Sequence, residues 1–323
     1  MPDKSLSYRK SLQIMKSEAG ERLDRVLAQH FSDVSRSQLT KWIKDGSVTV
    51  DGESRKPNHR LTGGESIEIS GAFQPKQDWD TATELELHII FQDDDILVID
   101  KPAGLVVHPG AATVAPTLAN GLLALRPELN RLPRAGIVHR LDKDTTGLLV
   151  VAASELARVR LIAALAKRQV SRSYLAVVEG QLASAREIDL PLGRSSRDRT
   201  RQTVRKDGRE ALTLLTPLAV FRAHTLVRAE LRTGRTHQIR VHAARTGLPL
   251  VGDLKYGAKR VVPPSASPGL SKLLRGIPRQ ALHAQQLAFE HPRTSQSLSF
   301  EAALPHDLRS LLEALHHDHE EHA

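Results

Sequence analysis

The chain has 323 residues, and its 46 Lys and Arg against 37 Asp and Glu give a formal net charge of +9. This length is enough for about two domains, and a hydrophobic content of 40% excludes a fully disordered chain. The absence of cysteine excludes disulfide frameworks, thiolate catalysis and cysteine-ligated metal sites. Because the sequence has no apolar leader and no apolar run approaching a membrane span, we expect a cytoplasmic protein without a membrane partner.

Charge and aromatic content limit the kind of partner. A basic excess is compatible with nucleic acid, although many enzymes with other substrates are also basic. Aromatic residues make up only 3% of the chain, which argues against a single-strand binder that stacks rows of bases. Of the 46 basic residues 32 are arginines, whose planar guanidinium groups suit bidentate phosphate recognition.

Residues 18–70 are predicted to form a small domain, preceded by an N-terminal extension over residues 1–17. Apolar residues recur at helical spacing around Leu27 and around Trp42, and they alternate in two short segments that follow. We therefore expect two helices followed by a small β unit. Five basic residues lie on or beside the helices and form either a solvated face or a phosphate-binding surface: Arg22, Arg25, Arg36, Lys41 and Lys44. We take Arg22, Arg36 and Lys41 as candidate RNA contacts.

A polar stretch over residues 71–82 has the composition of a linker, and residues 83–312 are predicted to form a larger domain. Strands, loops and helices alternate there without a βαβ rhythm, which indicates an α+β fold with a mostly antiparallel sheet and flanking helices. One helix begins after Ser154, and we expect it to turn Leu156, Val159 and Ile162 inward. Residues 313–323 are predicted to be a polar tail.

Residues 194–209 carry seven basic side chains and few apolar ones, which is typical of an exposed loop or ribbon. Such a segment is either a solvated hairpin or a surface that faces nucleic acid. We take Arg201 within it as a candidate RNA contact.

The segment from Gly136 to Val151 places a short polar loop between two apolar stretches, and the loop contains Asp142 and Asp144. Asp favours turns, but a loop held between buried strands is also a good mount for a catalytic carboxylate. Asp142 and Asp144 could form a glycosidase-like pair, although spacing in a loop does not give the distance between carboxylates. His139 with Asp142 lacks a second ligand cluster of matching spacing, so no metal site is predicted.

The segment from Leu231 to His242 is a second candidate. Thr236 is expected to cap a helix that starts at His237, which places Arg235 just before the positive end of that helix. Arg235 is therefore either a surface residue or a group that binds a carboxylate or phosphate. His237 and His242 are not four residues apart, as two metal ligands on one helix face would be, so we expect structural or RNA-contacting roles.

In their order along the chain, these segments resemble the motifs of the ribosomal large-subunit type of pseudouridine synthases. The stretch from His139 to Gly147 resembles the family signature, and residues 172–176 resemble its tyrosine motif. Residues 21–70 resemble the RNA-binding domain shared with a ribosomal small-subunit protein, the S-four type. The resemblance covers residues 18–310, and D-type members of the family are the most similar. The remaining matching blocks are residues 233–240, 252–257, 279–284 and 291–292.

The resemblance implies isomerisation of uridine in RNA, in which the base is detached from C1′, rotated and rejoined through C5. Asp142 would act at the sugar as nucleophile or as base, and Arg235 would pair with it, because an adjacent cation favours an ionised carboxylate. Tyr174 would stack on the uracil and assist removal of the C5 proton, and Arg140 would fill the space left by the flipped base. The reaction has no redox step, so no cofactor and no metal is expected.

The D-type resemblance also implies a partner, which is large-subunit (23S) rRNA or a ribosome assembly intermediate. We expect a monomer that supports ribosome assembly. The sequence leaves open which uridines are modified, and whether the substrate is of the D type or the C type. Two alternatives to a pseudouridine synthase predict different products. A non-catalytic RNA-binding or assembly factor would leave nucleoside composition unchanged, and a carboxylate glycosidase would release free uracil or sugar.

Overall fold

The computed structural model describes residues 6–31, 34, 36–73, 81–109, 116–257 and 259–323, with the backbone alone for 6, 7, 36, 37, 72 and 73. The chain divides into two compact units, residues 1–78 and 79–323, and the division falls within the expected linker. Among the described residues, no helix combines the length and the apolar character needed to cross a membrane.

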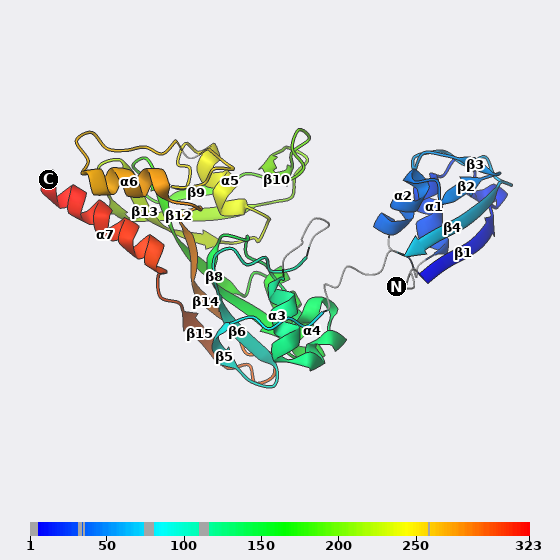
Figure 1. Cartoon of the computed structure of the whole chain (residues 1–323), viewed down its shortest axis with the longest axis horizontal. Coiled ribbons are helices and arrows are strands. Elements are labelled where there is room, and N and C mark those ends of the chain that lie inside the picture. Colours follow the sequence, from blue (N-terminus) through cyan, green and yellow to red (C-terminus); the bar gives the residue numbers. More distant parts are fainter. Residues whose placement is uncertain (1–5, 32–33, 35, 74–80, 110–115, 258) are drawn as a thin grey trace. The chain divides into compact units, whose positions relative to one another are not determined.

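The smaller unit packs two helices against one face of a four-stranded antiparallel sheet (Figure 1). Its elements are β1 (Leu6–Gln13), η1 (Lys16–Glu18), α1 (Leu23–His30), α2 (Arg36–Lys44), β2 (Val48–Val50), β3 (Glu53–Ser54) and β4 (Ser66–Phe73). The strand order is β1-β4-β2-β3. Leu27 and Trp42 on the helices and Ile67 on β4 lie in the shared core, as their spacing predicts.

The expected N-terminal extension is largely a strand of this sheet. Strand β1 pairs with β4 along its whole length, from Leu6 opposite Phe73 to Gln13 opposite Ser66. The ring of Tyr8 stacks on Trp42, with 5.4 Å between the ring centroids. Residues 6–13 therefore belong to the small domain, because alternate residues of a strand bring apolar surface to the same core.

The larger unit is built on a nine-stranded sheet, in the order β5-β6-β7-β14-β8-β13-β12-β9 with β15 beside β14. Neighbouring strands are antiparallel except for β7 and β14, which confirms the α+β fold with a mostly antiparallel sheet. The strands are β5 (His88–Gln92), β6 (Ile96–Lys101), β7 (Thr146–Ala152), β8 (Ser171–Glu179), β9 (Arg186–Asp189), β12 (Leu212–Val220), β13 (His224–Leu231), β14 (Leu282–Glu290) and β15 (Ser297–Glu301). A separate hairpin consists of β10 (Leu192–Arg194) and β11 (Gln202–Val204).

Helices pack on both faces of this sheet (Figure 1). They are α3 (Leu118–Leu125), η2 (Pro127–Arg131), η3 (Pro133–Gly136), α4 (Glu155–Ala166), α5 (Gln238–Arg245), α6 (Pro268–Gly276) and α7 (His306–Glu321). Along β6, Leu97 and Ile99 share a core with α3 and α5, whereas Ile96 and Val98 share another with α4. The first four residues of the strand are apolar because both of its faces are buried there.

Helix α4 turns inward a side that the sequence analysis did not predict. Ala157 and Leu161 are buried, whereas Leu156, Val159 and Ile162 are 36% to 53% exposed. The expected inward face is therefore wrong. Tertiary contacts at the N-terminus fix the rotation of the helix, because the Ser154 hydroxyl accepts from the N–H of Ala157 and donates to the buried Asp95.

The expected polar tail over residues 313–323 is also wrong, because helix α7 continues through it to Glu321. Leu308, Leu311 and Leu315 are buried at helical spacing, and most of that apolar stripe lies before residue 313. Nη1 of Arg222 donates to Oδ1 of the buried Asp318 at 3.0 Å, which anchors the last turns of the helix.

Candidate active site around Asp142

Asp142 lies on the loop between η3 and β7, in the wall of a cavity of about 840 Å³ within the larger unit. Its side chain is 14% exposed. The loop leaves η3 at Ile137, which bridges Val151, and it ends where β7 begins. The facing walls come from β8 and from the first turn of α5. A cavity of this size is typical of ligand pockets.

Buried basic side chains hold the backbone of this loop. Nζ of the fully buried Lys101 donates to the carbonyl of Lys143 at 2.8 Å and to two carbonyls in the loop after β6. Burial lowers the pKa of Lys101 to about 8. Nη1 of Arg279 donates to the carbonyl of Asp144 at 3.0 Å. Because the carbonyl groups of the two residues that follow Asp142 are both held, the Asp142 side chain projects from a rigid backbone.

The glycine of the same motif allows two strands to approach closely. Gly147 has a φ of +108°, and a β-carbon there would collide with the backbone of Ala284 on β14. Beside it, the hydroxyl of Thr146 is hydrogen-bonded to Nδ1 of His283 at 2.9 Å. A residue other than glycine would therefore push β7 away from β14 and move the loop that carries Asp142.

The carboxylate of Asp142 is paired with Arg240, on the first turn of α5. Nη1 of Arg240 donates to Oδ2 of Asp142 at 3.0 Å. Nε and Nη2 donate to the two oxygens of Asp253, at 2.7 and 2.8 Å. Burial opposes the charge of Arg240, but the hydrogen bonds to Asp253 outweigh it and raise the pKa of the guanidinium. Arg240 therefore stays charged and fixes one oxygen of Asp142.

The expected pairing of Arg235 with Asp142 is wrong. Nε of Arg235 donates instead to the backbone carbonyl of Glu210 at 2.9 Å. The N–H of Arg235 donates to Oε1 of Gln238, so the turn before α5 is fixed by a buried amide. Helix α5 begins at Gln238, and His237 caps it in a left-handed conformation. This turn brings Arg240 to the carboxylate, although both arginines belong to the same sequence motif.

Tyr174 lies on β8 and contributes to the cavity wall. It is 5% exposed, with Ala229 and Ala284 beside it on the neighbouring strands. Burial raises the pKa of the Tyr174 phenol, and the negative charge of Asp142 acts in the same direction. The phenol is therefore neutral at pH 7, and its ring is available to a planar ligand beside Asp142.

His237 is part of the site in a way that the sequence analysis missed. Its Nε2 lies 3.8 Å from Oδ1 of Asp142, and its Nδ1 is hydrogen-bonded to the hydroxyl of Tyr256 at 2.5 Å. Burial lowers the pKa of His237. His237 has a positive φ of 56°, and it lines the cavity at the start of α5. A non-glycine residue with a positive φ often marks a functional site, but this conformation can be seen only in the structure and not in the sequence.

Two other histidines of the candidate motifs support the structure. Nε2 of His139 accepts the N–H of Val150 at 3.1 Å, and burial lowers its pKa to about 3. His242 is buried between Thr213 and Leu190. Within the residues that the structure describes, no group of three or more His, Asp or Glu side chains is placed to hold a metal ion.

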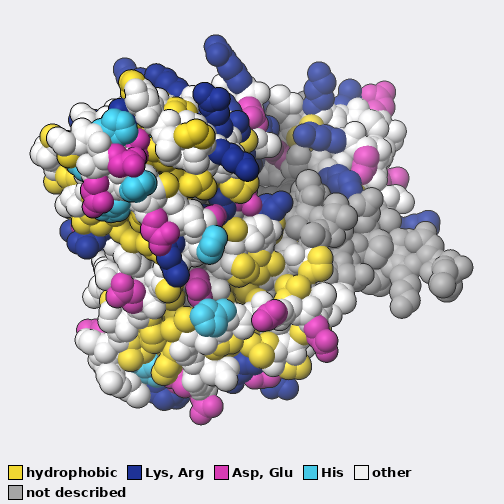
Figure 2. Space-filling view, turned by 60° about the vertical axis from the view of Figure 1, so that its left-hand side comes forward, with side chains coloured by type: hydrophobic (Ala, Val, Ile, Leu, Met, Phe, Trp, Pro, Cys, Tyr) yellow, Lys and Arg dark blue, Asp and Glu magenta, His cyan; other side chains and the backbone are white. Residues whose placement is uncertain are grey.

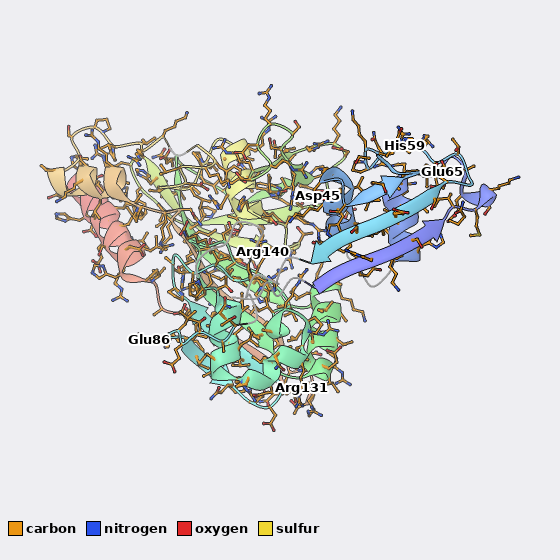
Figure 3. The ribbon with its side chains drawn as sticks, turned by 45° about the vertical axis from the view of Figure 1, so that its right-hand side comes forward. Asp45, His59, Glu65, Glu86, Arg131 and Arg140 are labelled. Carbon is orange, nitrogen blue, oxygen red and sulfur yellow. The ribbon has the colours of Figure 1, made fainter. Side chains whose placement is uncertain are left out.

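Arg140 also lines the cavity, and its side chain is exposed. In Figure 3 it lies in the middle of the larger unit, away from Glu86 and Arg131. An exposed cation that lines the cavity, two residues before the partly buried carboxylate of Asp142, is well placed to meet an anionic ligand. The base-displacing role of Arg140 stays a prediction.

The basic residues expected to bind RNA in the smaller unit differ in their environment. Arg22 donates two hydrogen bonds to Asp24, at 2.9 and 2.8 Å, so its guanidinium already has an anionic partner. Lys41 on α2 is exposed. The side chain of Arg36 lies outside the described residues. Lys41 is therefore the better placed of the two described residues to meet a phosphate.

The basic segment over residues 194–209 forms the β10–β11 hairpin and its flanks. Most of its basic side chains are exposed, and Figure 2 shows one face of the molecule where Lys and Arg gather toward the upper edge. Nε of Arg201 is 3.6 Å from Oδ2 of Asp198. Its guanidinium carbon lies over the ring of Tyr256, 5.9 Å from the ring centroid. The N–H of Gln202 donates to the Tyr256 hydroxyl at 2.9 Å. The hairpin is thus in contact with a residue that also contacts His237.

Comparisons with known proteins show the family of this chain. Residues 95–245 match the RNA pseudouridylate synthase family, and residues 21–67 match the S4 domain. The chain is 46% identical over 307 residues to the ribosomal large subunit pseudouridine synthase D of Vibrio parahaemolyticus, covering 95% of this chain and 94% of that protein. It is 48% identical over 301 residues to the protein of the same name from Pseudomonas aeruginosa, covering 93% and 94%.

A solved structure gives the same result. Human RNA pseudouridylate synthase domain containing 4 matches with a TM-score of 0.55 and 27% identity, over 71% of this chain and 93% of that one. The matching family segment contains Asp142, Tyr174 and Arg240, which form the walls of the cavity. The chain therefore belongs to the RNA pseudouridylate synthase family and carries an S4 domain in its smaller unit.

Proposed function

We propose that this protein isomerises uridines of large-subunit ribosomal RNA to pseudouridine, with Asp142 as the catalytic carboxylate. The relatives at 46% and 48% identity are named as ribosomal large subunit enzymes, and they match over nearly the whole chain. The observation that carries the assignment to Asp142 is its ion pair with the buried Arg240 in the wall of the cavity. A carboxylate held ionised beside a sugar carbon is the group that this reaction requires.

The reaction balances within one nucleotide. The bond between C1′ and N1 breaks, a bond between C1′ and C5 forms, and the proton lost from C5 is matched by one gained at N1. Asp142 acts at the sugar, either on C1′ as a nucleophile or on a sugar proton as a base. Both roles need the ionised carboxylate, which the adjacent charge of Arg240 favours.

Tyr174 and Arg140 serve the base and the space that it leaves. The neutral ring of Tyr174 supplies a flat apolar surface for the uracil, and its raised pKa makes stacking a better role than proton acceptance. The target uridine has to leave its stack, which costs roughly a few kcal/mol. The exposed cation of Arg140 at the cavity mouth fills the vacated position and contacts the backbone.

The remaining contacts are made to the RNA backbone. Lys41 in the S4 domain and Arg201 on the hairpin bind phosphates, whereas Arg22 does so only when it leaves Asp24. We assign the protein the D-type substrate, a stem-loop of the large-subunit rRNA that touches the decoding region. It acts as a cytoplasmic monomer on rRNA or on an assembly intermediate, and it supports ribosome assembly through binding as well as catalysis.

The test is a comparison of rRNA from cells that lack the gene and cells that carry it as wild type or as D142N. Pseudouridines are mapped by base-selective chemical labelling and primer-extension stops. Wild type restores the missing stops, and D142N does not, although it remains folded and binds RNA. A matched control is D94N, which makes the same change at an exposed carboxylate in the turn between β5 and β6.

The outcomes separate the enzyme from its alternatives. Stops that D142N restores would remove Asp142 from its assigned role. Stops that are the same with and without the gene would leave an RNA-binding assembly factor. Release of free uracil by the purified protein would instead indicate a glycosidase.

A further inference from the structure

The hydroxyl of Tyr256 joins the basic hairpin to the active-site helix. It accepts the backbone N–H of Gln202, the first residue of β11, at 2.9 Å, and it is bonded to Nδ1 of His237 at 2.5 Å. The guanidinium groups of Arg201 and Arg240 lie over its ring, 5.9 and 5.1 Å from the centroid. Tyr256 therefore lies between the hairpin, which is proposed to bind RNA, and the start of α5, which is proposed to face the sugar.

These bonds select one tautomer of His237. A backbone N–H can only donate, so the Tyr256 oxygen is the acceptor from Gln202. Among the described residues, the phenol proton has Nδ1 of His237 as its acceptor, because the other bond of this hydroxyl is to an N–H. In a neutral imidazole the proton consequently sits on Nε2. The opposite tautomer would leave the phenol proton without this acceptor and turn a lone pair toward Asp142.

The selected proton lies on the ring nitrogen that is near the carboxylate of Asp142. Nε2 of His237 is 3.8 Å from Oδ1 of Asp142, and Arg240 holds the other oxygen, Oδ2, at 3.0 Å. The two oxygens of Asp142 are thus distinguished by their neighbours. Asp253 binds Arg240 and also accepts the backbone N–H of Tyr256 at 3.2 Å, so one buried carboxylate places both groups.

We propose that Tyr256 and His237 are positioning residues, in which Tyr256 holds His237 as the Nε2–H tautomer directed at Oδ1 of Asp142. This arrangement orients the carboxylate and connects it to the hairpin through the bond between Tyr256 and Gln202. The kinetic consequence rests on the proposed function, because it concerns the rate of uridine isomerisation. The tautomer itself is a property of the protein without RNA.

The spectroscopic test uses the full chain labelled with ¹⁵N-histidine at pH 8, where an ordinary histidine is neutral. Two-bond ¹H–¹⁵N correlations identify the protonated ring nitrogen of each histidine. The signal of His237 is assigned by its absence in H237N, since asparagine tolerates the left-handed backbone. His242 is an internal reference, because its Nε2 faces the carbonyl of Leu190 and must carry a proton.

Wild type is expected to show His237 as the Nε2–H tautomer, and Y256F to show a substantial Nδ1–H population with His242 unchanged. A wild-type His237 protonated on Nδ1 would overturn the proposal. So would a His237 spectrum that Y256F leaves unaltered.

The kinetic test compares Y256F with wild type on an rRNA fragment. The loss of one hydrogen bond to a group that orients the carboxylate is expected to lower kcat about tenfold, with KM within about twofold. A tautomer shift with an unchanged kcat would overturn the positioning role while the proposed function stands. A wild-type protein that forms no pseudouridine would refute the proposed function, and the spectra would still decide the tautomer.

Discussion

The guanidinium of Arg240 reaches Oδ2 of Asp142 at 3.0 Å while its other two nitrogens are occupied by Asp253. Asp253 is 1% exposed, so it cannot release Arg240 to another partner without becoming an unpaired buried charge. One arginine is thus shared between the buried carboxylate of Asp253 and the proposed catalytic carboxylate of Asp142. The bidentate bond to Asp253 sets the direction in which the third nitrogen points.

This geometry predicts that R240K lowers kcat much more than R235K. Lysine keeps the charge but has a single nitrogen, which cannot bind Asp253 twice and reach Asp142 as well. Loss of one oriented donor at a reacting centre typically costs about 10² to 10³ in kcat. R235K is the matched control, because a lysine can still donate to the carbonyl of Glu210. Single-turnover rates on an rRNA fragment measure both, and equal losses would show that the ion pair has no special role.

Lys101 gives the larger unit a defined dependence of stability on pH. Its pKa is about 8 in the folded chain, against 10.5 for an ordinary lysine. Between these values the unfolded chain binds more protons, so the stability of the folded form rises as pH rises through that window. The expected gain is about 3 kcal/mol, or about 10 °C in a unit of this size.

The substitution K101M removes this titration. Calorimetric midpoints of wild type and K101M, measured from pH 7.5 to pH 10.5, are expected to diverge in favour of wild type as the pH rises. Both proteins share all other groups that titrate in alkali, so the difference between their curves reports the titration of Lys101 alone. Parallel curves would mean that the pKa of Lys101 is the same in the folded and the unfolded chain.

Periodicity and composition were sufficient for the architecture but not for the ion pair. The apolar run that begins β6 and the helical spacing in α1 and α2 are set by local burial, so they can be read from sequence. Asp142 and Tyr174 were predicted from the resemblance of their segments to family motifs, and both line the cavity. The choice between Arg235 and Arg240 depends on the left-handed turn at His237 and on Asp253, which contacts α5 from outside it.

The errors elsewhere have the same origin. Leu156, Val159 and Ile162 were expected inward on α4. Apolar residues lie on more than one side of this helix, and the cap at Ser154 goes with the rotation that buries Ala157 and Leu161. In α7 the buried leucines mostly precede the histidine-rich end. Composition alone therefore suggested a tail where an earlier apolar stripe extends the helix.

Gly147 is predicted to tolerate no side chain. In G147A the backbone would be strained at a φ of +108° and the new β-carbon would collide with Ala284, which together cost about 2–5 kcal/mol. Gly104 is the matched control, since it has a φ of +82° with open space where a β-carbon would lie, and G104A is expected to cost about 1–2 kcal/mol. Urea unfolding of the larger unit compares the two, and similar costs would mean that the packing against β14 relaxes freely.

The exposed arginines of the hairpin are predicted to act through affinity and not through the chemical step. Replacing Arg194, Arg197 and Arg199 by Gln removes three charges that face solvent. The slope of log Kd against log salt is then expected to fall by about one for each phosphate that the variant no longer binds, and KM to rise while kcat stays within about twofold. The control replaces three exposed basic residues at the other end of the larger unit, Lys272, Arg275 and Arg309. If the control weakens RNA binding as much as the hairpin variant, net charge rather than this surface attracts the RNA.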